Sequence, residues 1–292
     1  GGGRAIWVSV LVRGASLYVA LLYQTWATYP LIDFCRSTDG GATWVLASST
    51  TSAGTRVQLL ADADGRNFYM AAATLMRLQT LGDYWLTVET ATQQFNVMRI
   101  SGATLLLAGE KGLEGVALAE GGLSGKIAVG AIGQYLGVAL DSKNVAWAAG
   151  PAGLFGNVGG PQPWKEASSL GVGSIAAPAS GSQNIFAAAN ATVLVSTNAG
   201  ANFSSKTVIP STEARAPYPP LVMDPINPAT VYVAGRRVYR STDSGATWQT
   251  LGTVDPDGNV VTALAVAPFA VQILYAATAC LPEVRPTPPC PN

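Results

Sequence analysis

Short apolar runs separated by turn residues recur along the whole chain, and they are most regular between residues 216 and 253. There, apolar and β-branched residues at 221–223, 231–234, 238–241 and 248–251 alternate with segments rich in Gly, Pro, Asn and Asp. Runs of this length, bounded by such residues, are typical of β-strands joined by tight turns. We therefore predict four consecutive antiparallel strands in this segment.

Comparable groups of apolar runs cover almost the whole chain. They divide it into units at about 4–48, 55–90, 95–130, 134–168, 172–209, 216–253 and 258–279. The last unit has two clear strands and no evident second hairpin before the Pro-rich tail at 280–292. Four antiparallel strands per unit, at a period of this size, are typical of the blades of a β-propeller.

We therefore predict an all-β fold over residues 1–279, a β-propeller of four-stranded antiparallel blades. It has about seven blades, the last of them incomplete, and a Cys-bounded, Pro-rich tail or linker follows at 280–292. Closure of the ring would come from that tail, from sequence outside this chain or from a partner, because an open sheet edge invites aggregation.

An eight-residue phrase occurs three times, before the last predicted strand of a unit. It reads STDGGATW at 37–44, STNAGANF at 196–203 and STDSGATW at 241–248. Its closing aromatic recurs with spacings of 41, 79, 39 and 45 residues, at Trp44, Trp85, Trp164, Phe203 and Trp248. The gap of 79 spans two units, so the period is about 41 residues. Degenerate copies of the phrase are marked by Arg77, Gly82, Trp85 and Trp164.

The phrase resembles the Asp-box, also called the BNR or sialidase repeat, and the resemblance extends over essentially the whole chain. It implies a β-propeller in which these turns lie at the blade periphery, away from the central pocket. The motif is specific for architecture and says little about activity. Weaker similarity links the chain to propellers of the photosystem II assembly factor type and of the xyloglucanase type.

Elementary chemistry gives each position of the phrase a structural role. The carboxylates of Asp39 and Asp243 are expected to accept hydrogen bonds from backbone N–H groups of their own turn, as Asx turns do, and Asn198 can replace them. The glycines allow positive φ, and the aromatic rings are expected to be buried between neighbouring blades. The predicted structural residues are Ser37, Asp39, Gly41, Trp44, Ser196, Asn198, Gly200, Phe203, Ser241, Asp243, Gly245 and Trp248.

Composition excludes several function classes. The chain has 292 residues, of which 49% are hydrophobic and 12% charged; its formal net charge is zero and it contains no His. Without His, Ser-His-Asp and Cys-His catalysis and imidazole metal sites are excluded, and three Cys make a structural zinc site implausible. A neutral chain lacks the basic excess expected of a nucleic-acid partner. We predict no metal and no cofactor.

The sequence also suggests two alternatives to a scaffold role. A glycoside hydrolase needs two facing carboxylates, and Glu110, Glu114 and Glu120 crowd into the unit that departs most from the repeat. The three arginines, the Tyr–Glu pair and the Arg-Ile-Pro segment of sialidases are not recognisable here, and the chain is long enough for only one propeller of the xyloglucanase type. An assembly factor for a membrane complex needs a basic patch, for which Arg236, Arg237 and Arg240 are the candidates, ordinary turn arginines being the alternative.

The cysteines are informative about the cellular compartment of the protein. Cys280 and Cys290 flank a Pro-rich loop and are candidates for a disulfide, with Cys35 left over; three buried thiols are the alternative. A disulfide would indicate an oxidising setting. The sequence contains no stretch of 18 apolar residues without a charge, so we predict no membrane-spanning helix. The start of the chain lacks the pattern of a signal peptide.

We predict a non-catalytic scaffold that is extracellular, at the cell surface or periplasmic. Its partner is expected to be a protein or a further copy of the chain, with a glycan as the alternative.

Overall fold

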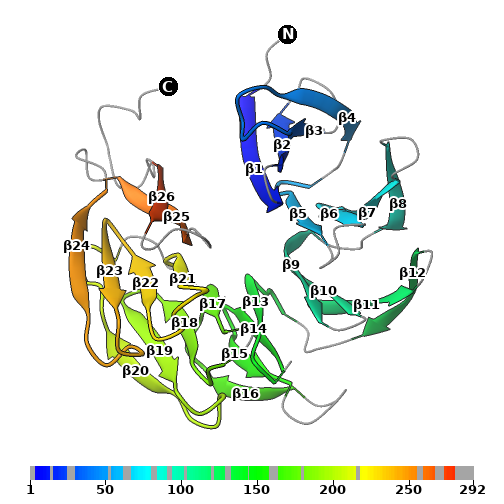
Figure 1. Ribbon diagram of the computed structural model, residues 1–292. Coiled ribbons are helices and arrows are strands. Elements are labelled where there is room, and N and C mark those ends of the chain that lie inside the picture. Colours follow the sequence, from blue (N-terminus) through cyan, green and yellow to red (C-terminus); the bar gives the residue numbers. More distant parts are fainter. Residues whose placement is uncertain are drawn as a thin grey trace. The chain divides into compact units, whose positions relative to one another are not determined.

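The computed structural model describes residues 4–13, 16–24, 30–51, 54–61, 67–79, 84–90, 94–101, 104–119, 122–128, 133–143, 145–157, 164–178, 181–214, 218–254, 259–266 and 273–279. Every regular element in these ranges is a β-strand (Figure 1). The chain forms two compact units, Gly1–Gln134 and Tyr135–Asn292. No helix in the described ranges is both long and apolar enough to cross a membrane.

The described residues of the first unit form three four-stranded antiparallel sheets. Their strands are β1 (Arg4–Arg13), β2 (Ser16–Gln24), β3 (Leu31–Ser37), β4 (Val45–Thr51), β5 (Gln58–Ala61), β6 (Phe68–Ala71), β7 (Thr74–Gln79), β8 (Tyr84–Thr90), β9 (Phe95–Ser101), β10 (Thr104–Gly109), β11 (Leu113–Ala119) and β12 (Gly122–Ala128). Each strand pairs with the next one in the chain, in the orders β1-β2-β3-β4, β5-β6-β7-β8 and β9-β10-β11-β12. The first strands of successive sheets lie against each other, β1 on β5 and β5 on β9.

The second unit repeats this arrangement. Its strands are β13 (Gly137–Leu140), β14 (Ala146–Gly150), β15 (Gly153–Gly156), β16 (Lys165–Ser168), β17 (Ser174–Ala176), β18 (Ile185–Ala189), β19 (Thr192–Ser196), β20 (Ser204–Thr207), β21 (Leu221–Met223), β22 (Val231–Ala234), β23 (Arg237–Ser241), β24 (Gln249–Thr253), β25 (Val260–Val266) and β26 (Leu274–Ala279). They form three four-stranded sheets, from β13 to β24, and a two-stranded sheet of β25 and β26. The four-stranded antiparallel sheets that the sequence pattern predicts are thus confirmed.

Burial falls from the second strand of a sheet to its fourth. All residues of β14 and β18 are buried, whereas all residues of β20 and β24 are exposed. Strand β18 packs on the fourth sheet through Ile185 and Ala187 and on the sixth sheet through Phe186 and Ala188. Burial on both faces explains why its sequence IFAAA is continuously apolar rather than alternating. The fourth strands form the outer edge of each sheet.

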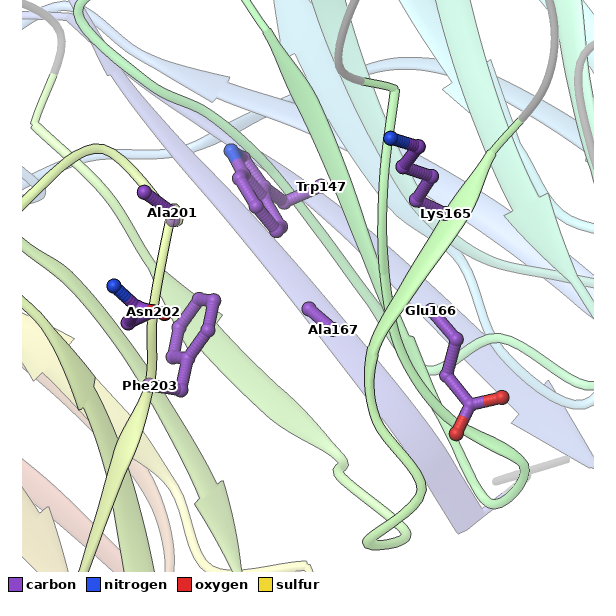
Figure 2. Close-up of a pocket in the computed structure, with 8 residues that line it drawn as sticks. Trp147, Lys165, Glu166, Ala167, Ala201, Asn202 and Phe203 are labelled. Carbon is purple, nitrogen blue, oxygen red and sulfur yellow. The ribbon is translucent and has the colours of Figure 1, made fainter.

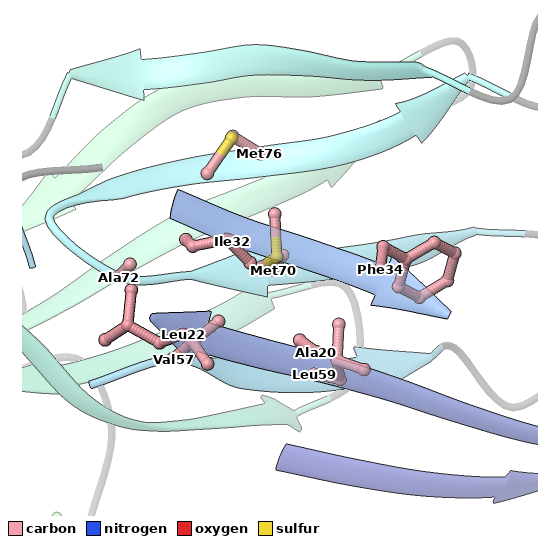
Figure 3. Packing of buried hydrophobic residues seen from close by; sticks show 9 residues of the cluster. All are labelled: Ala20, Leu22, Ile32, Phe34, Val57, Leu59, Met70, Ala72 and Met76. Atoms are coloured by element: carbon pink, nitrogen blue, oxygen red, sulfur yellow. The ribbon is translucent and has the colours of Figure 1, made fainter. Parts of the chain in front are cut away.

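Within each unit, the hydrophobic core is divided into layers between successive sheets. Between the first two sheets, Figure 3 shows side chains from β2 and β3 meeting side chains of the second sheet. The members of this cluster are Ala20, Leu22, Ile32, Phe34, Val57, Leu59, Met70, Ala72 and Met76. Because each layer is made by two sheets, no sheet could bury its apolar face alone.

Candidate functional site

The phrase in the sixth sheet forms a turn stabilised by its own side chains. The Asp243 carboxylate accepts hydrogen bonds from Thr247 N (2.9 Å) and Thr247 Oγ1 (2.5 Å), and Ser241 Oγ donates to it over 2.8 Å. Gly245 N donates to Ser241 Oγ (2.8 Å), and Trp248 Nε1 donates to the carbonyl of Gly245 (3.1 Å). These bonds occupy both carboxylate oxygens of Asp243 within the turn.

The other two copies of the phrase repeat this bonding with one informative difference. In the first sheet, Asp39 accepts hydrogen bonds from Thr43 N (2.9 Å) and Thr43 Oγ1 (2.6 Å). In the fifth, Asn198 Oδ1 accepts from Asn202 N (3.0 Å), and Gly200 N donates to Ser196 Oγ (2.9 Å). Asn198 therefore keeps the bond to the main chain without a charge, so the turn itself does not require the carboxylate.

The aromatic residue that closes the phrase packs on the sheet that precedes it in the chain. Phe203 meets Trp147 of β14 edge to face, with ring centroids 5.6 Å apart, and Trp248 packs on a cluster that includes Phe186 and Val195 of the preceding sheet. Trp44 belongs to the first sheet and is 46% exposed. The prediction that every closing ring is buried is therefore wrong for Trp44, because β1–β4 is the first sheet among the described residues and no earlier one covers the ring there.

The degenerate copies are described only in part. Arg77 lies in β7 and is partly buried, and Trp85 lies in β8, where it is the register partner of Leu78. Gly82 lies outside the described residues. Trp164 stands directly before β16, and its Nε1 atom is buried without a hydrogen-bond partner in the described part of the chain.

The hydrogen bonds of the turn lower the pKa of its carboxylate. The Thr247 hydroxyl, the Thr247 backbone N–H and the Ser241 hydroxyl, in that order, bring the pKa of Asp243 from 3.8 to about 2. The corresponding bonds from Thr43 and Ser37 also lower the pKa of Asp39. A depressed folded-state pKa adds stability above the unfolded-state pKa, and this stability is lost as the pH falls through the folded-state value.

We expect Asp243→Asn to flatten the acid limb of the stability profile. The free energy of unfolding of the natural protein should fall between about pH 4 and about pH 2, and the variant should lose the part of this fall that Asp243 contributes. Urea unfolding followed across this pH range measures the difference. An Asn198→Ala variant is the control, because it alters an equivalent turn that has no titrating group. An acid limb of unchanged slope in Asp243→Asn would contradict the assignment.

A cavity of about 460 Å³ lies beside the phrase of the fifth sheet. Its walls come from β14, β16 and the turn before β20 (Figure 2). The lining residues are Trp147, Lys165, Glu166, Ala167, Gly200, Ala201, Asn202 and Phe203. Lys165 and Glu166 are neighbours on one strand and so project to opposite faces; in Figure 2 the Glu166 carboxylate points away from the two rings. The cavity thus offers the partly buried ring of Phe203, an amide and an ammonium group, with the buried ring of Trp147 behind them.

Trp147, at the base of this cavity, is held by a residue that sequence analysis missed. Asp141 is 4% exposed; its Oδ1 accepts hydrogen bonds from Lys143 N and Val145 N (both 2.9 Å), and its Oδ2 accepts one from Trp147 Nε1 (3.1 Å). The sequence contains a signal for this residue, because Asp141 and Asp224 both come directly after the first strand of their sheets. Asp141 is thus a positioning residue for the indole ring.

The arginine cluster does not form one patch. Arg236 lies in the turn between β22 and β23, while Arg237 and Arg240 are three residues apart on β23 and project from opposite faces of the sheet. Arg237 forms an ion pair with Glu213 (3.6 Å), and Arg240 donates to Gln249 over 3.5 Å. The structure therefore ties two of these side chains to neighbours within the second unit.

The remaining candidate groups are scattered. Glu110 is exposed after β10, Glu114 lies in β11, and Glu120 lies outside the described residues. Cys35 is a partly buried free thiol whose pKa is raised by burial and by Asp33. The predicted bridge between Cys280 and Cys290 also lies outside the described residues. In the ranges that are described, no group of three or more His, Cys, Asp or Glu side chains could hold a metal ion.

Comparison with known proteins shows the fold. No family model matches the chain, and no curated protein matches it. Among solved structures, Sqt1 of Saccharomyces cerevisiae aligns with 94% of this chain and 80% of its own, at 12% identity and a TM-score of 0.69. YCF48 from Cyanidioschyzon merolae aligns with 90% of this chain and 88% of its own, at 14% identity and a TM-score of 0.58. The likeness to these propeller proteins shows a β-propeller fold.

Proposed function

We propose that this chain is a non-catalytic, extracytoplasmic β-propeller scaffold of the Asp-box type that binds a protein partner within a larger assembly. The observation that carries the proposal is the cavity beside Phe203, whose lining combines two aromatic residues with the polar side chains of Lys165, Glu166 and Asn202. A volume of about 460 Å³ lies within the range that is typical of binding sites. We further propose that β25 and β26 are the first two strands of a seventh blade.

The chemistry of the cavity favours recognition of a protein loop. The partly buried ring of Phe203 can accept an apolar side chain. Trp147, which is 1% exposed, supports that ring from beneath. The Lys165 ammonium and the Asn202 amide can donate hydrogen bonds to a carboxylate or a main-chain carbonyl of that loop. A partner segment with an apolar residue beside an acidic one fits these groups.

The titratable groups support binding rather than hydrolysis. Asp39 and Asp243 are engaged by their own turns. Tyr239 donates a hydrogen bond to Glu213 over 2.7 Å, and burial followed by this bond raises the pKa of the phenol. A phenol with a raised pKa stays protonated, which is the opposite of what a nucleophilic Tyr–Glu pair requires.

The partner site can be tested by photocrosslinking in the source cells. With a benzophenone amino acid in place of Ala201, we expect one discrete protein adduct that is lost when Lys165→Glu is added. The same amino acid in place of the exposed Thr250, on the outer strand of the next sheet, is the matched control. No adduct at position 201, or the same adduct at position 250, would overturn the assignment of this site.

A glycan-hydrolysis assay tests the non-catalytic role separately. We expect no turnover of fluorogenic sialosides or β-glucosides by the purified chain. Turnover that is abolished by Glu110→Gln or Glu114→Gln would show that the glycoside hydrolase alternative is correct. For the assembly-factor alternative, the divided arginine cluster provides no contiguous basic surface.

A further inference from the structure

The two-stranded sheet of the second unit ends at β26 among the described residues (Figure 1). In the three sheets before it, the second strands β14, β18 and β22 each pair with a third strand as well as with the first. The sequence of β26, LYAATA, resembles AWAAG, IFAAA and VYVA of those buried second strands. It differs from SSKT and QTLGT of the exposed outer strands β20 and β24. β26 therefore has the continuously apolar sequence of a strand inside a sheet.

One aromatic position shows the difference most clearly. The second residue of β14, β18 and β22 is Trp147, Phe186 and Tyr232, and these three rings are between 0% and 3% exposed. The second residue of β26 is Tyr275, which is 60% exposed. In the three earlier sheets, a third strand runs beside the strand that carries the ring. The exposed ring of Tyr275 indicates that the β25–β26 sheet is completed by further residues.

The earlier sheets show where a third strand beside β26 would lie. Leu154 of β15 and Leu194 of β19 belong to one layer of the core. Val195 of β19 and Tyr239 of β23 belong to the next layer. Third strands of successive sheets thus pack on one another. A third strand beside β26 would therefore cover β23 of the sixth sheet.

The face of β23 that such a strand would cover carries a positive charge. Arg240 is the register partner of Tyr232, and directly paired residues lie on the same face of a sheet. Tyr232 packs on the β25–β26 sheet, so Arg240 projects to the side on which β26 lies. Its Nε atom is buried without a hydrogen-bond partner in the described part of the chain. Its one hydrogen bond there goes to the neutral amide of Gln249 (3.5 Å), so a carboxylate would be a stronger partner.

We propose that β26 accepts an antiparallel β-strand from a protein partner, and that a carboxylate of this strand pairs with Arg240. In strand addition, main-chain hydrogen bonds provide affinity and alternate side chains provide specificity. On the face that meets β23, the added strand carries an apolar residue beside Val238 and an acidic residue beside Arg240. The segment 280–292 does not fit this role, because it contains five Pro, and Pro cannot donate to a ladder. The inference rests on the proposed seventh blade and not on the cavity beside Phe203.

Two peptides of seven residues, blocked at both ends and labelled with fluorescein, test the proposal on the full chain. Their sequences are TVTVTET and TVTVTKT, in which Val and Thr favour an extended strand. We expect the acidic peptide to bind about tenfold more tightly than the basic one, because only the acidic peptide places an opposite charge beside Arg240. Fluorescence anisotropy measures both affinities at protein concentrations up to about 0.5 mM. Hydrogen exchange should slow in β26 when the acidic peptide is bound.

Arg240→Glu should reverse the preference, so that the basic peptide binds more tightly than the acidic one. Restored binding of the basic peptide shows that this variant is folded, and circular dichroism checks it independently. Arg36→Glu is the matched control, because Arg36 and Arg240 each stand directly before the first Ser of the phrase and the change of charge is the same. It should leave both affinities unchanged.

Failure of the acidic peptide to bind would overturn the proposal, and so would a preference that Arg240→Glu leaves unchanged. Protection from exchange in other strands, with none in β26, would place the peptide elsewhere and also contradict it. A chain that is dimeric by sedimentation without peptide, and becomes monomeric when peptide is added, would show that a second copy occupies this edge instead. Crosslinking at Ala201 tests the cavity independently, so the two sites can fail separately.

Discussion

Replacing Gly200 by Ala should lower the free energy of unfolding by about 3–5 kcal/mol, because strain in the turn and overpacking of a core ring add together. Gly200 has φ = +78°, a conformation that favours glycine. A Cβ atom at this position would overlap the ring of Trp147. Trp147 is 1% exposed, and Asp141 holds its indole nitrogen, so the ring has little room to move. Urea unfolding followed by circular dichroism measures the loss.

The neighbouring residue provides the opposite change as a control. Ala199 also has positive φ, +55°, and its backbone N–H bond to Gln183 does not involve the side chain. Relief of the left-handed conformation outweighs the extra chain entropy of Gly, so Ala199→Gly should stabilise the protein by about 0.5–1 kcal/mol. If Gly200→Ala were as stable as the natural protein, the contact between this turn and Trp147 would be wrong.

The features that sequence predicted are those that depend on local geometry. The strands follow from short apolar runs between turn residues. The bonds of Asp243 join groups at most four residues apart, so the phrase alone contains both donor and acceptor. Asn198 supports this point, because it still accepts a hydrogen bond from the backbone of its own turn although the phrase there has Asn in place of Asp.

The features that sequence did not predict depend on contacts between sheets. Trp44 and Trp248 close nearly identical phrases, yet Trp44 is exposed and Trp248 is packed against the preceding sheet. The cavity likewise combines Lys165 of one sheet with Asn202 of the next. The phrase does not specify which side chains of the adjoining sheet lie opposite, and these decide whether a ring is covered or lines a cavity.

Asp141→Ala should cost about 3–5 kcal/mol of unfolding free energy, because it removes the acceptor of three hydrogen bonds at a buried site. The indole N–H of Trp147 and the backbone N–H groups of Lys143 and Val145 would lose their partner. Asp224→Ala is the matched control, since Asp224 holds the equivalent place but accepts bonds only from backbone groups of an exposed turn. Water can replace that acceptor, so this variant should lose only about 1 kcal/mol.

A double-mutant cycle separates the bond to the ring from the bonds to the backbone. In a Trp147→Phe background no indole N–H remains to be left unpaired, so Asp141→Ala should cost at least about 1 kcal/mol less than in the natural protein. An unchanged cost would mean that Asp141 acts through its turn alone. A reduced cost would establish that the carboxylate fixes the indole ring, and with it the wall of the cavity at which we propose that a partner binds.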